Sequence, residues 1–175
     1  MTVMSTKPRI ELRRVSHSKS LSEETPAYSA QVWVDGVHFC DVANHGQGGP
    51  DEVHGVKGET NSAFYPRLEA LNARIAATYP SHTYDAGGET HSFDESLEMI
   101  CHGIVWDADT DKAVKRDLAG KVMWLRDGRV YSISLRGKYK RFTREQIVAH
   151  VKTKEPDARF LHDMPLTEAR KYLVA

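Results

Sequence analysis

The sequence predicts an α+β fold in which an antiparallel three-strand meander and a second β-hairpin pack with four to five helices. Two Asp-Gly pairs, at residues 35–36 and 127–128, stand between segments of alternating apolar and polar residues, which is typical of hairpins with a type I′ turn. Other segments repeat apolar residues at the helical period. With 175 residues, the chain is expected to form a single domain over residues 1–175, with residues 1–7 as a flexible N-terminal tail.

The meander is expected in the first quarter of the chain. Residues 8–15 alternate loosely and predict its first strand. Residues 28–43 predict a hairpin that turns at residues 35–36. The spacing predicts three cross-strand pairs: Val34 with Val37, Val32 with Phe39, and Trp33 with His38.

Two helices are expected next. Pro66 suits the first turn of a helix in residues 64–79, which has one apolar stripe: Leu68, Leu71, Ile75 and Tyr79. Ser92 and Glu95 have the spacing of a capping box, which predicts a second helix that ends near Trp106. Its inward residues are expected to be Leu97, Ile100, Cys101 and Ile104.

The last third of the chain predicts a short helix over residues 110–118 and then a hairpin over residues 121–135. Thr143 and Gln146 have the spacing of another capping box, for a helix that ends before Pro156, and residues 165–174 predict a final helix. One face of the hairpin is expected to carry Val122, Trp124, Tyr131 and Ile133.

Two loops of the meander are predicted to form one site. The loop after the first strand, residues 20–27, and the segment after the third, residues 44–55, lie at the same end of such a sheet. The later segment has four glycines, one proline and two histidines in twelve positions. The expected ligand-binding residues are Glu23, Thr25, Asn44, Gly46, Gly48, Gly49 and His54.

Three interpretations of these loops stay open. The glycines can serve only to supply positive φ angles, with Asn44 hydrogen-bonded to its own backbone, or the loops can bind a ligand. In the third interpretation, the loops form the active site of a hydrolase or transferase for a phosphorylated or nucleotide-like substrate, and the glycine N–H groups cradle its anion. Glu23 or Glu24 is then the general base and His45 or His54 the general acid, with Glu24 and His45 as the favoured pair. The segment matches neither the phosphate-binding nor the dinucleotide-binding glycine pattern, so no cofactor is expected.

No metal site is expected either, although the chain has nine histidines. Zinc sites use close pairs such as Cys-x2-Cys or His-x3-His, and the sequence has none.

Cys40 and Cys101 are expected to be ordinary thiols, which fits a reducing cytoplasm. The first residues lack the apolar core of a signal peptide, and no stretch approaches the ~18 apolar residues of a membrane span. We therefore expect a cytoplasmic protein with no membrane partner.

Charge is separated along the chain. Residues 80–111 contain eight acidic residues and no lysine or arginine, whereas residues 112–144 contain eleven basic and two acidic residues. The net charge of zero hides this excess. The basic part is expected to bind a partner, either a nucleic acid or an acidic protein surface. Its expected contact residues are Arg126, Arg129, Arg136, Lys138, Tyr139, Lys140, Arg141 and Arg144.

Four segments, residues 20–36, 44–50, 68–80 and 122–135, resemble small uncharacterised proteins carried by bacteriophages, plasmids and other mobile elements of proteobacteria. The resemblance brings no catalytic residue and no cofactor with it. It implies an accessory protein that binds a macromolecule, either a host protein or a ribonucleoprotein complex, and inhibits a host defence system such as CRISPR-Cas.

Overall fold

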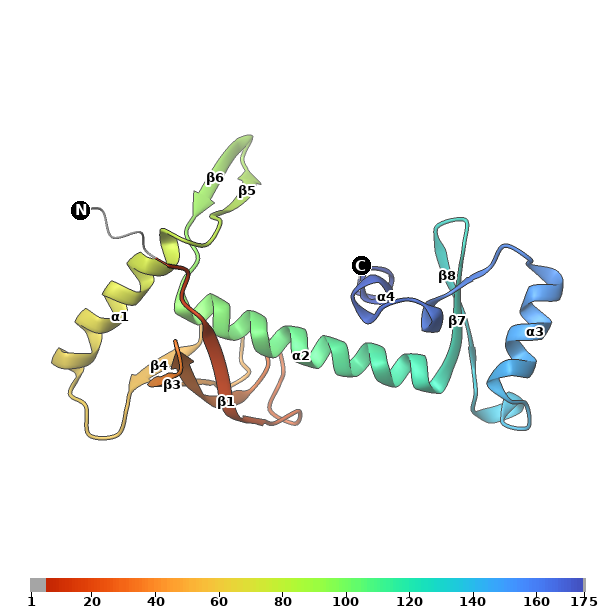
Figure 1. The fold of residues 1–175 in the computed structure, drawn as a ribbon, viewed down its shortest axis with the longest axis horizontal. Helices are drawn as coiled ribbons and strands as arrows, with labels where there is room; N and C mark the ends of the chain where they lie inside the picture. The colour runs from red at the N-terminus through yellow and green to blue at the C-terminus, as the bar shows by residue number, and fades with distance from the viewer. Residues whose placement is uncertain (1–5, 175) are drawn as a thin grey trace. The chain divides into compact units, whose positions relative to one another are not determined.

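The computed structural model describes residues 6–174 and has the expected α+β architecture (Figure 1). The described chain divides into two compact units, one ending at Trp106 and the other starting at Asp107. We call them the N-terminal and the C-terminal unit. Most of the expected N-terminal tail, residues 1–5, lies outside the described residues.

The sheet of the N-terminal unit is an antiparallel meander with the strand order β1-β2-β3-β4. The expected three strands are present, and the end of the glycine-rich segment adds a fourth. The bounds are β1 Ile10–His17, β2 Tyr28–Val34, β3 Val37–Asn44 and β4 Glu52–Gly55. Residues 45–51 alone therefore form the loop that follows β3.

The hairpin register is confirmed next to the turn and shifts beyond it. Val34 pairs with Val37 and Trp33 with His38, but Val32 pairs with Cys40. The expected pair of Val32 with Phe39 is wrong because the register shifts between Val32 and Trp33, as in a β-bulge.

Asp35 fixes the turn of this hairpin with its side chain as well as its backbone. It has a positive φ of 52°, and its carboxylate accepts hydrogen bonds from the backbone N–H of Arg9 at 2.9 Å and from the guanidinium of Arg74 at 2.6 Å. These two donors, the backbone N–H first, lower the pKa of Asp35. Arg74 also donates to the carbonyl of Thr6 at 2.8 Å, which ties the start of the described chain to the first helix.

That helix, α1 Asn61–Ala76, covers one face of the sheet with the predicted stripe. Its buried residues are Phe64, Leu68, Leu71 and Ile75. The expected place of Pro66 in the first turn is wrong, because the helix begins at Asn61 and Pro66 lies inside it. Tyr79 lies beyond the helix end and packs against the same core.

The segment around Ser92 differs from the prediction. Residues 82–93 form a hairpin, β5 His82–Ala86 and β6 Glu89–Phe93, in which every residue is exposed (Figure 1). The capping box of Ser92 and Glu95 is therefore wrong: Ser92 pairs with Thr83 in the hairpin, and the next helix begins five residues later, at Leu97.

This helix, α2 Leu97–Gly120, is continuous. The expected end near Trp106 and the separate helix over residues 110–118 are both wrong. The aspartates after Trp106 suggest a connection, but no glycine or proline occurs between residues 104 and 119, so nothing in the sequence breaks the helix. Leu97, Cys101 and Val105 pack with α1 and the sheet in the core of the N-terminal unit.

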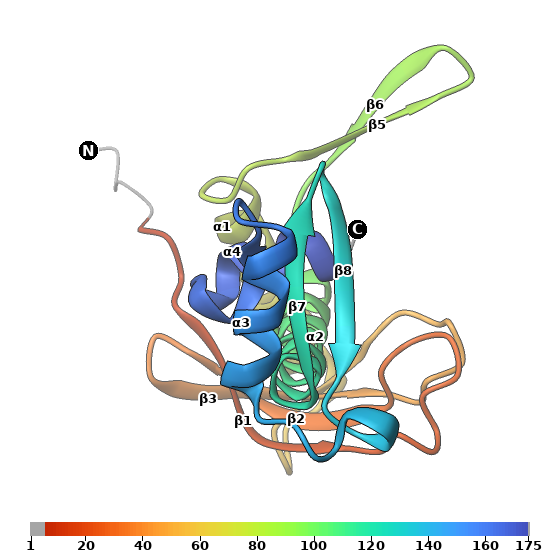
Figure 2. The same cartoon turned by 90° about the vertical axis from the view of Figure 1, so that its right-hand side faces the viewer.

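The C-terminal unit has a small antiparallel sheet with β7 in its centre (Figure 2). The strands are β7 Lys121–Arg126, β8 Arg129–Ser134 and β9 Arg159–Phe160, and the helices of this part are α3 Arg144–Lys154 and α4 Leu166–Leu173. Short helical turns, η1 Gly137–Tyr139 and η2 Leu161–Asp163, complete it. The Thr143–Gln146 capping box is confirmed, since both of its hydrogen bonds are present.

β7 is buried on both faces. Val122 and Trp124 pack with α3, whereas Met123 and Leu125 pack with α4 and η2. Val122 pairs with Ile133 and Trp124 with Tyr131, as predicted for one face of the hairpin. The C-terminal unit therefore consists of a thin sheet between two helices, each of which closes its own apolar cluster.

Candidate functional site

The two loops that were predicted to meet do so in the N-terminal unit. The backbone N–H groups of Glu23 and Glu24 both donate to the carbonyl of Gly46 at 3.0 Å, and that of Thr25 lies 3.4 Å from the same oxygen. Three consecutive N–H groups thus surround one carbonyl, in the arrangement that binds anions elsewhere. Here the chain's own carbonyl occupies it.

Asn44 joins the loops to the sheet. Its side-chain oxygen accepts from the N–H of Gly46 and from the hydroxyl of Thr25, both at 2.8 Å, and its amide donates to Asp51 at 2.8 Å. Asp51 also accepts a hydrogen bond from the hydroxyl of Tyr28. Burial and the neighbouring carboxylate raise the pKa of Tyr28, which stays a donor. Asn44 and Asp51 are buried polar residues whose hydrogen bonds are made within the chain.

The loop leaves little room for the anion cradle of the catalytic interpretation. The N–H of Gly46 is bound to Asn44, and the N–H of Gly48 donates to the hydroxyl of Thr25 at 3.3 Å. A side chain on Gly46, whose φ is +85°, would place its Cβ only 2.1 Å from the carbonyl oxygen of Leu21. This glycine is required by the close approach of the two loops.

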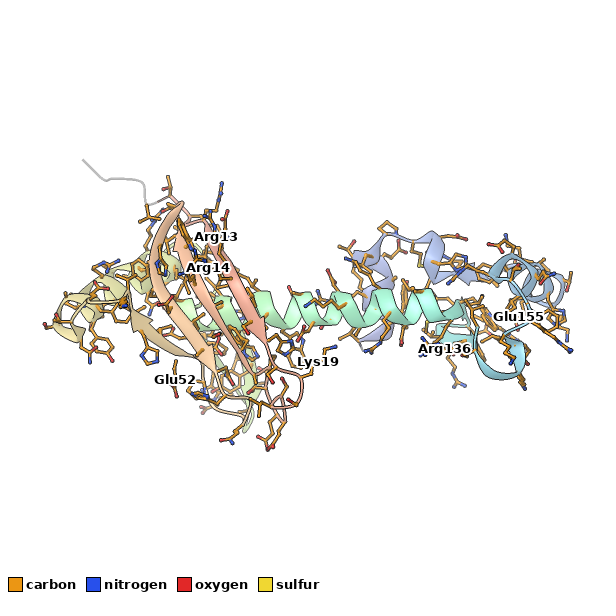
Figure 3. All side chains as sticks on the ribbon, turned by 90° about the horizontal axis from the view of Figure 1, so that it is seen from below. Arg13, Arg14, Lys19, Glu52, Arg136 and Glu155 are labelled. Atoms are coloured by element: carbon orange, nitrogen blue, oxygen red, sulfur yellow. The ribbon has the colours of Figure 1, made fainter. Side chains whose placement is uncertain are left out.

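The expected catalytic pair is not assembled. In the described chain no hydrogen bond or ion pair joins Glu24 to His45. His45 is 74% exposed and lies 3.8 Å from the carboxylate of Glu52, which is labelled in Figure 3; His54 lies 3.6 Å from the same carboxylate. The two histidines therefore share a solvent-exposed partner on β4.

The structure brings together another set of residues beside this loop, which sequence reasoning missed. His102, one turn into α2, lies with its Nδ1 atom 3.6 Å from the carboxylate of Asp51, and its ring stacks on that of Trp106. A groove of about 600 Å³ runs past these residues. The i, i+4 spacing of His102 and Trp106 was a usable signal, but the contact with Asp51 depends on how α2 packs beside the loop.

In the C-terminal unit, one expected contact residue serves the fold. The guanidinium of Arg144 donates to the carbonyls of Leu118, Ala119 and Lys121 at 2.7, 3.0 and 3.1 Å. Helices end with unsatisfied carbonyls, and a cation at this position satisfies them. Arg144 therefore caps the C-terminal end of α2.

Arg126 is also engaged within the unit. Its guanidinium lies 3.2 Å from the carboxylate of Glu155, which accepts the indole N–H of Trp124 at 2.6 Å. Arg126 is directly opposite Arg129 in the hairpin, as predicted, and the ion pair with Glu155 offsets part of this like-charge repulsion.

The other expected cations lie together on the segment after β8. We call residues 136–142 the basic segment. Its cations Arg136, Lys138, Lys140 and Arg141 are exposed, and Arg136 projects from the stretch after β8 (Figure 3). Among the described residues, none of these four forms an ion pair with a carboxylate.

Two rings accompany these cations. The rings of Tyr139 and Phe142 are 6.4 Å apart, with Lys138 at 4.9 Å over the first and Arg141 at 5.2 Å over the second. Both rings line a pocket of about 370 Å³, the other walls of which are Ile133, Gln146, Ile147 and His150. A ring-lined pocket thus lies beside four cations that form no ion pair with a described carboxylate, and two of these cations lie over its rings.

The charge separation follows the two units. The C-terminal unit has sixteen lysines and arginines against ten acidic residues, and the N-terminal unit has eight against fourteen. Over the described residues, no three or more His, Cys, Asp or Glu side chains are grouped to hold a metal ion. None of the described helices is both long enough and apolar enough to cross a membrane.

Comparison with known proteins found no matching family model, no similar curated protein and no similar solved structure.

Proposed function

We propose that this protein is a non-catalytic binding protein whose C-terminal unit binds single-stranded nucleic acid. The observation that carries the proposal is the basic segment, in which cations without a carboxylate partner lie beside a pocket lined by Tyr139 and Phe142. Cations bind the phosphate backbone of any sequence, and aromatic rings stack on unpaired bases. The seven residues of the basic segment contain both cations and aromatic rings.

The rings favour a nucleic acid over an acidic protein surface. An acidic peptide would use the four cations but would leave the pocket empty and the ring of Phe142 41% exposed. Each stacked base contributes about 1–3 kcal/mol in single-strand binding proteins, whereas surface ion pairs contribute about 0–1 kcal/mol. A single strand therefore accounts for more of the surface than an acidic peptide does.

The proposal is tested by fluorescence anisotropy with a labelled single-stranded oligonucleotide of mixed sequence at several salt concentrations. Lys138→Glu/Lys140→Glu should abolish binding at moderate salt. Lys115→Glu/Lys171→Glu is the matched control, because it makes the same change in net charge at two exposed lysines of the same unit outside the basic segment. Equal losses in both double variants would mean that only overall charge matters and would refute a defined site.

Phe142→Ala separates stacking from charge. It should weaken binding by about tenfold, as expected from the loss of one stacked base, while the dependence of affinity on salt stays the same because no phosphate contact is removed. Preference for an acidic peptide over the oligonucleotide would reject the proposal in favour of a protein partner.

The resemblance to proteins of mobile elements extends the proposal to a role: inhibition of a host defence complex that contains nucleic acid, such as a CRISPR-Cas effector. This role stays a prediction, and a target-cleavage assay of such an effector with added protein tests it. A hydrolase or transferase at the two loops is the less favoured alternative, because no hydrogen bond or ion pair joins Glu24 to His45 in the described chain and the N–H groups of Gly46 and Gly48 are already bound.

A further inference from the structure

The groove in the N-terminal unit lies between loop residues 48–51 and the first turns of α2. On the helix side, Met99 and Trp106 are large apolar residues that are 37% and 47% exposed. Gly103 stands four residues after the first and three before the second, so all three share one helix face. A Cβ at Gly103 would meet no atom within 4 Å, and the helix surface is therefore hollowed between two apolar side chains.

The polar groups of the groove are carboxylates and one histidine. Asp51 has a completely buried side chain at the inner wall, held by Asn44 and Tyr28, and Glu98 lines the helix side. The lining includes no lysine or arginine, and the loop N–H groups of Gly46 and Gly48 are bound within the chain. An anionic ligand would meet carboxylates with no cation to offset them.

The groove suits a cationic ligand instead. The indole of Trp106 is the aromatic ring that attracts cations most strongly, and the carboxylate of Glu98 lies along the same groove. The apolar walls at Met99 and Pro50 suit the methylene stem of a long basic side chain. Arginine fits better than lysine, because its planar guanidinium stacks on an indole and is less strongly hydrated. The net negative charge of the N-terminal unit favours the approach of such a ligand.

We propose that this groove binds an arginine side chain from a basic polypeptide segment of a partner protein. The proposal stands apart from the nucleic-acid site, which lies in the other unit and has the opposite charge. If both hold, one chain binds the nucleic acid and the basic protein of a nucleoprotein complex through different units.

The test follows the amide signal of Gly103 and the methyl signal of Met99 by NMR in the full chain. The probe is the blocked tripeptide acetyl-Gly-Arg-Gly-amide, and its citrulline counterpart has nearly the same shape without the charge. The arginine peptide should shift both signals saturably, and the citrulline peptide should do so much more weakly. Equal shifts from the two peptides would overturn the proposal.

Variants separate the groove from general acidity. Trp106→Ala should weaken binding of the arginine peptide by about tenfold, the range of a cation–π contact. Tyr84→Ala removes another half-exposed ring of the same unit, outside the groove, and should leave binding unchanged. Glu98→Gln changes one carboxylate without loss of volume and should also weaken binding.

Three results would reject the arginine-bearing partner. A saturable shift of the same signals by adenosine monophosphate in place of the peptide would make the groove a nucleotide site. Shifts that grow with protein concentration alone would mean that a second copy of the chain is the occupant. No saturable shift with the arginine peptide, in a protein whose spectrum shows it folded, would remove the site altogether.

Discussion

Gly46→Ala is expected to destabilise the N-terminal unit strongly. The residue has a φ of +85°, which costs a non-glycine residue about 1–2 kcal/mol. The new Cβ would also lie 2.1 Å from the carbonyl oxygen of Leu21 and 2.9 Å from the Cβ of Ala27, so the loops must separate. Separation weakens the hydrogen bonds from Glu23 and Glu24, each worth about 0.5–1.5 kcal/mol. We expect a total loss of about 3 kcal/mol.

Two neighbouring glycines provide matched controls. Gly48 has nearly the same φ, +81°, but a Cβ there would meet only the mobile end of the Glu24 side chain, so Gly48→Ala should lose only about 1–2 kcal/mol. Gly49 has no positive φ and open space around it, so Gly49→Ala should change stability by less than about 1 kcal/mol. The assay is urea unfolding followed by circular dichroism. If Gly46→Ala loses no more than Gly48→Ala, the close approach of the loops is not what holds them.

Three further predictions concern other parts of the fold. The hydrogen bonds that lower the pKa of Asp35 stabilise the fold above about pH 4, and this stabilisation is lost as the pH falls below that value. The unfolding curves of Asp35→Asn and of the parent chain should therefore converge in acid. Asp127→Asn, in the other Asp-Gly turn, is the control. Arg144→Ala should lower the stability of the C-terminal unit by about 1.5–3 kcal/mol in thermal unfolding, and an unchanged midpoint would rule out its capping role. Burial raises the pKa of Cys40 to about 12 and also raises the pKa of Cys101. Both thiols should therefore react with Ellman's reagent at about pH 8 only after urea is added. Fast reaction of the folded protein would contradict their burial.

The elements that the sequence predicted correctly depend on interactions between near neighbours in the chain. An Asp-Gly turn needs only two residues with positive φ, and both hairpins turn at these pairs. The capping box of Thr143 needs only the residue three positions later. The stripe of α1 is set by the helical period.

The errors arose where two local signals compete. Ser92 and Glu95 have the spacing of a capping box, but residues 82–93 also alternate in a way that suits a hairpin, which turns at Gly87 and Gly88. The aspartates after Trp106 are polar enough for a connection and are equally tolerated on an exposed helix. Neither conflict can be resolved within the segment itself.

The sequence by itself determined the order of the first three strands of the first sheet, and therefore that the loop of Glu24 and the loop of Asn44 meet at one end of it. Only the tertiary structure decided which groups these loops bind. Their N–H groups donate to acceptors within the same two loops, and α2 brings His102 to the buried carboxylate of Asp51. Likewise, only the tertiary structure shows that Arg144, one of the expected contact residues, caps a helix that ends more than twenty positions earlier in the chain. The physical reason is that a polar group is satisfied by whichever partner packing places within about 3 Å, and that partner has no fixed spacing in the sequence.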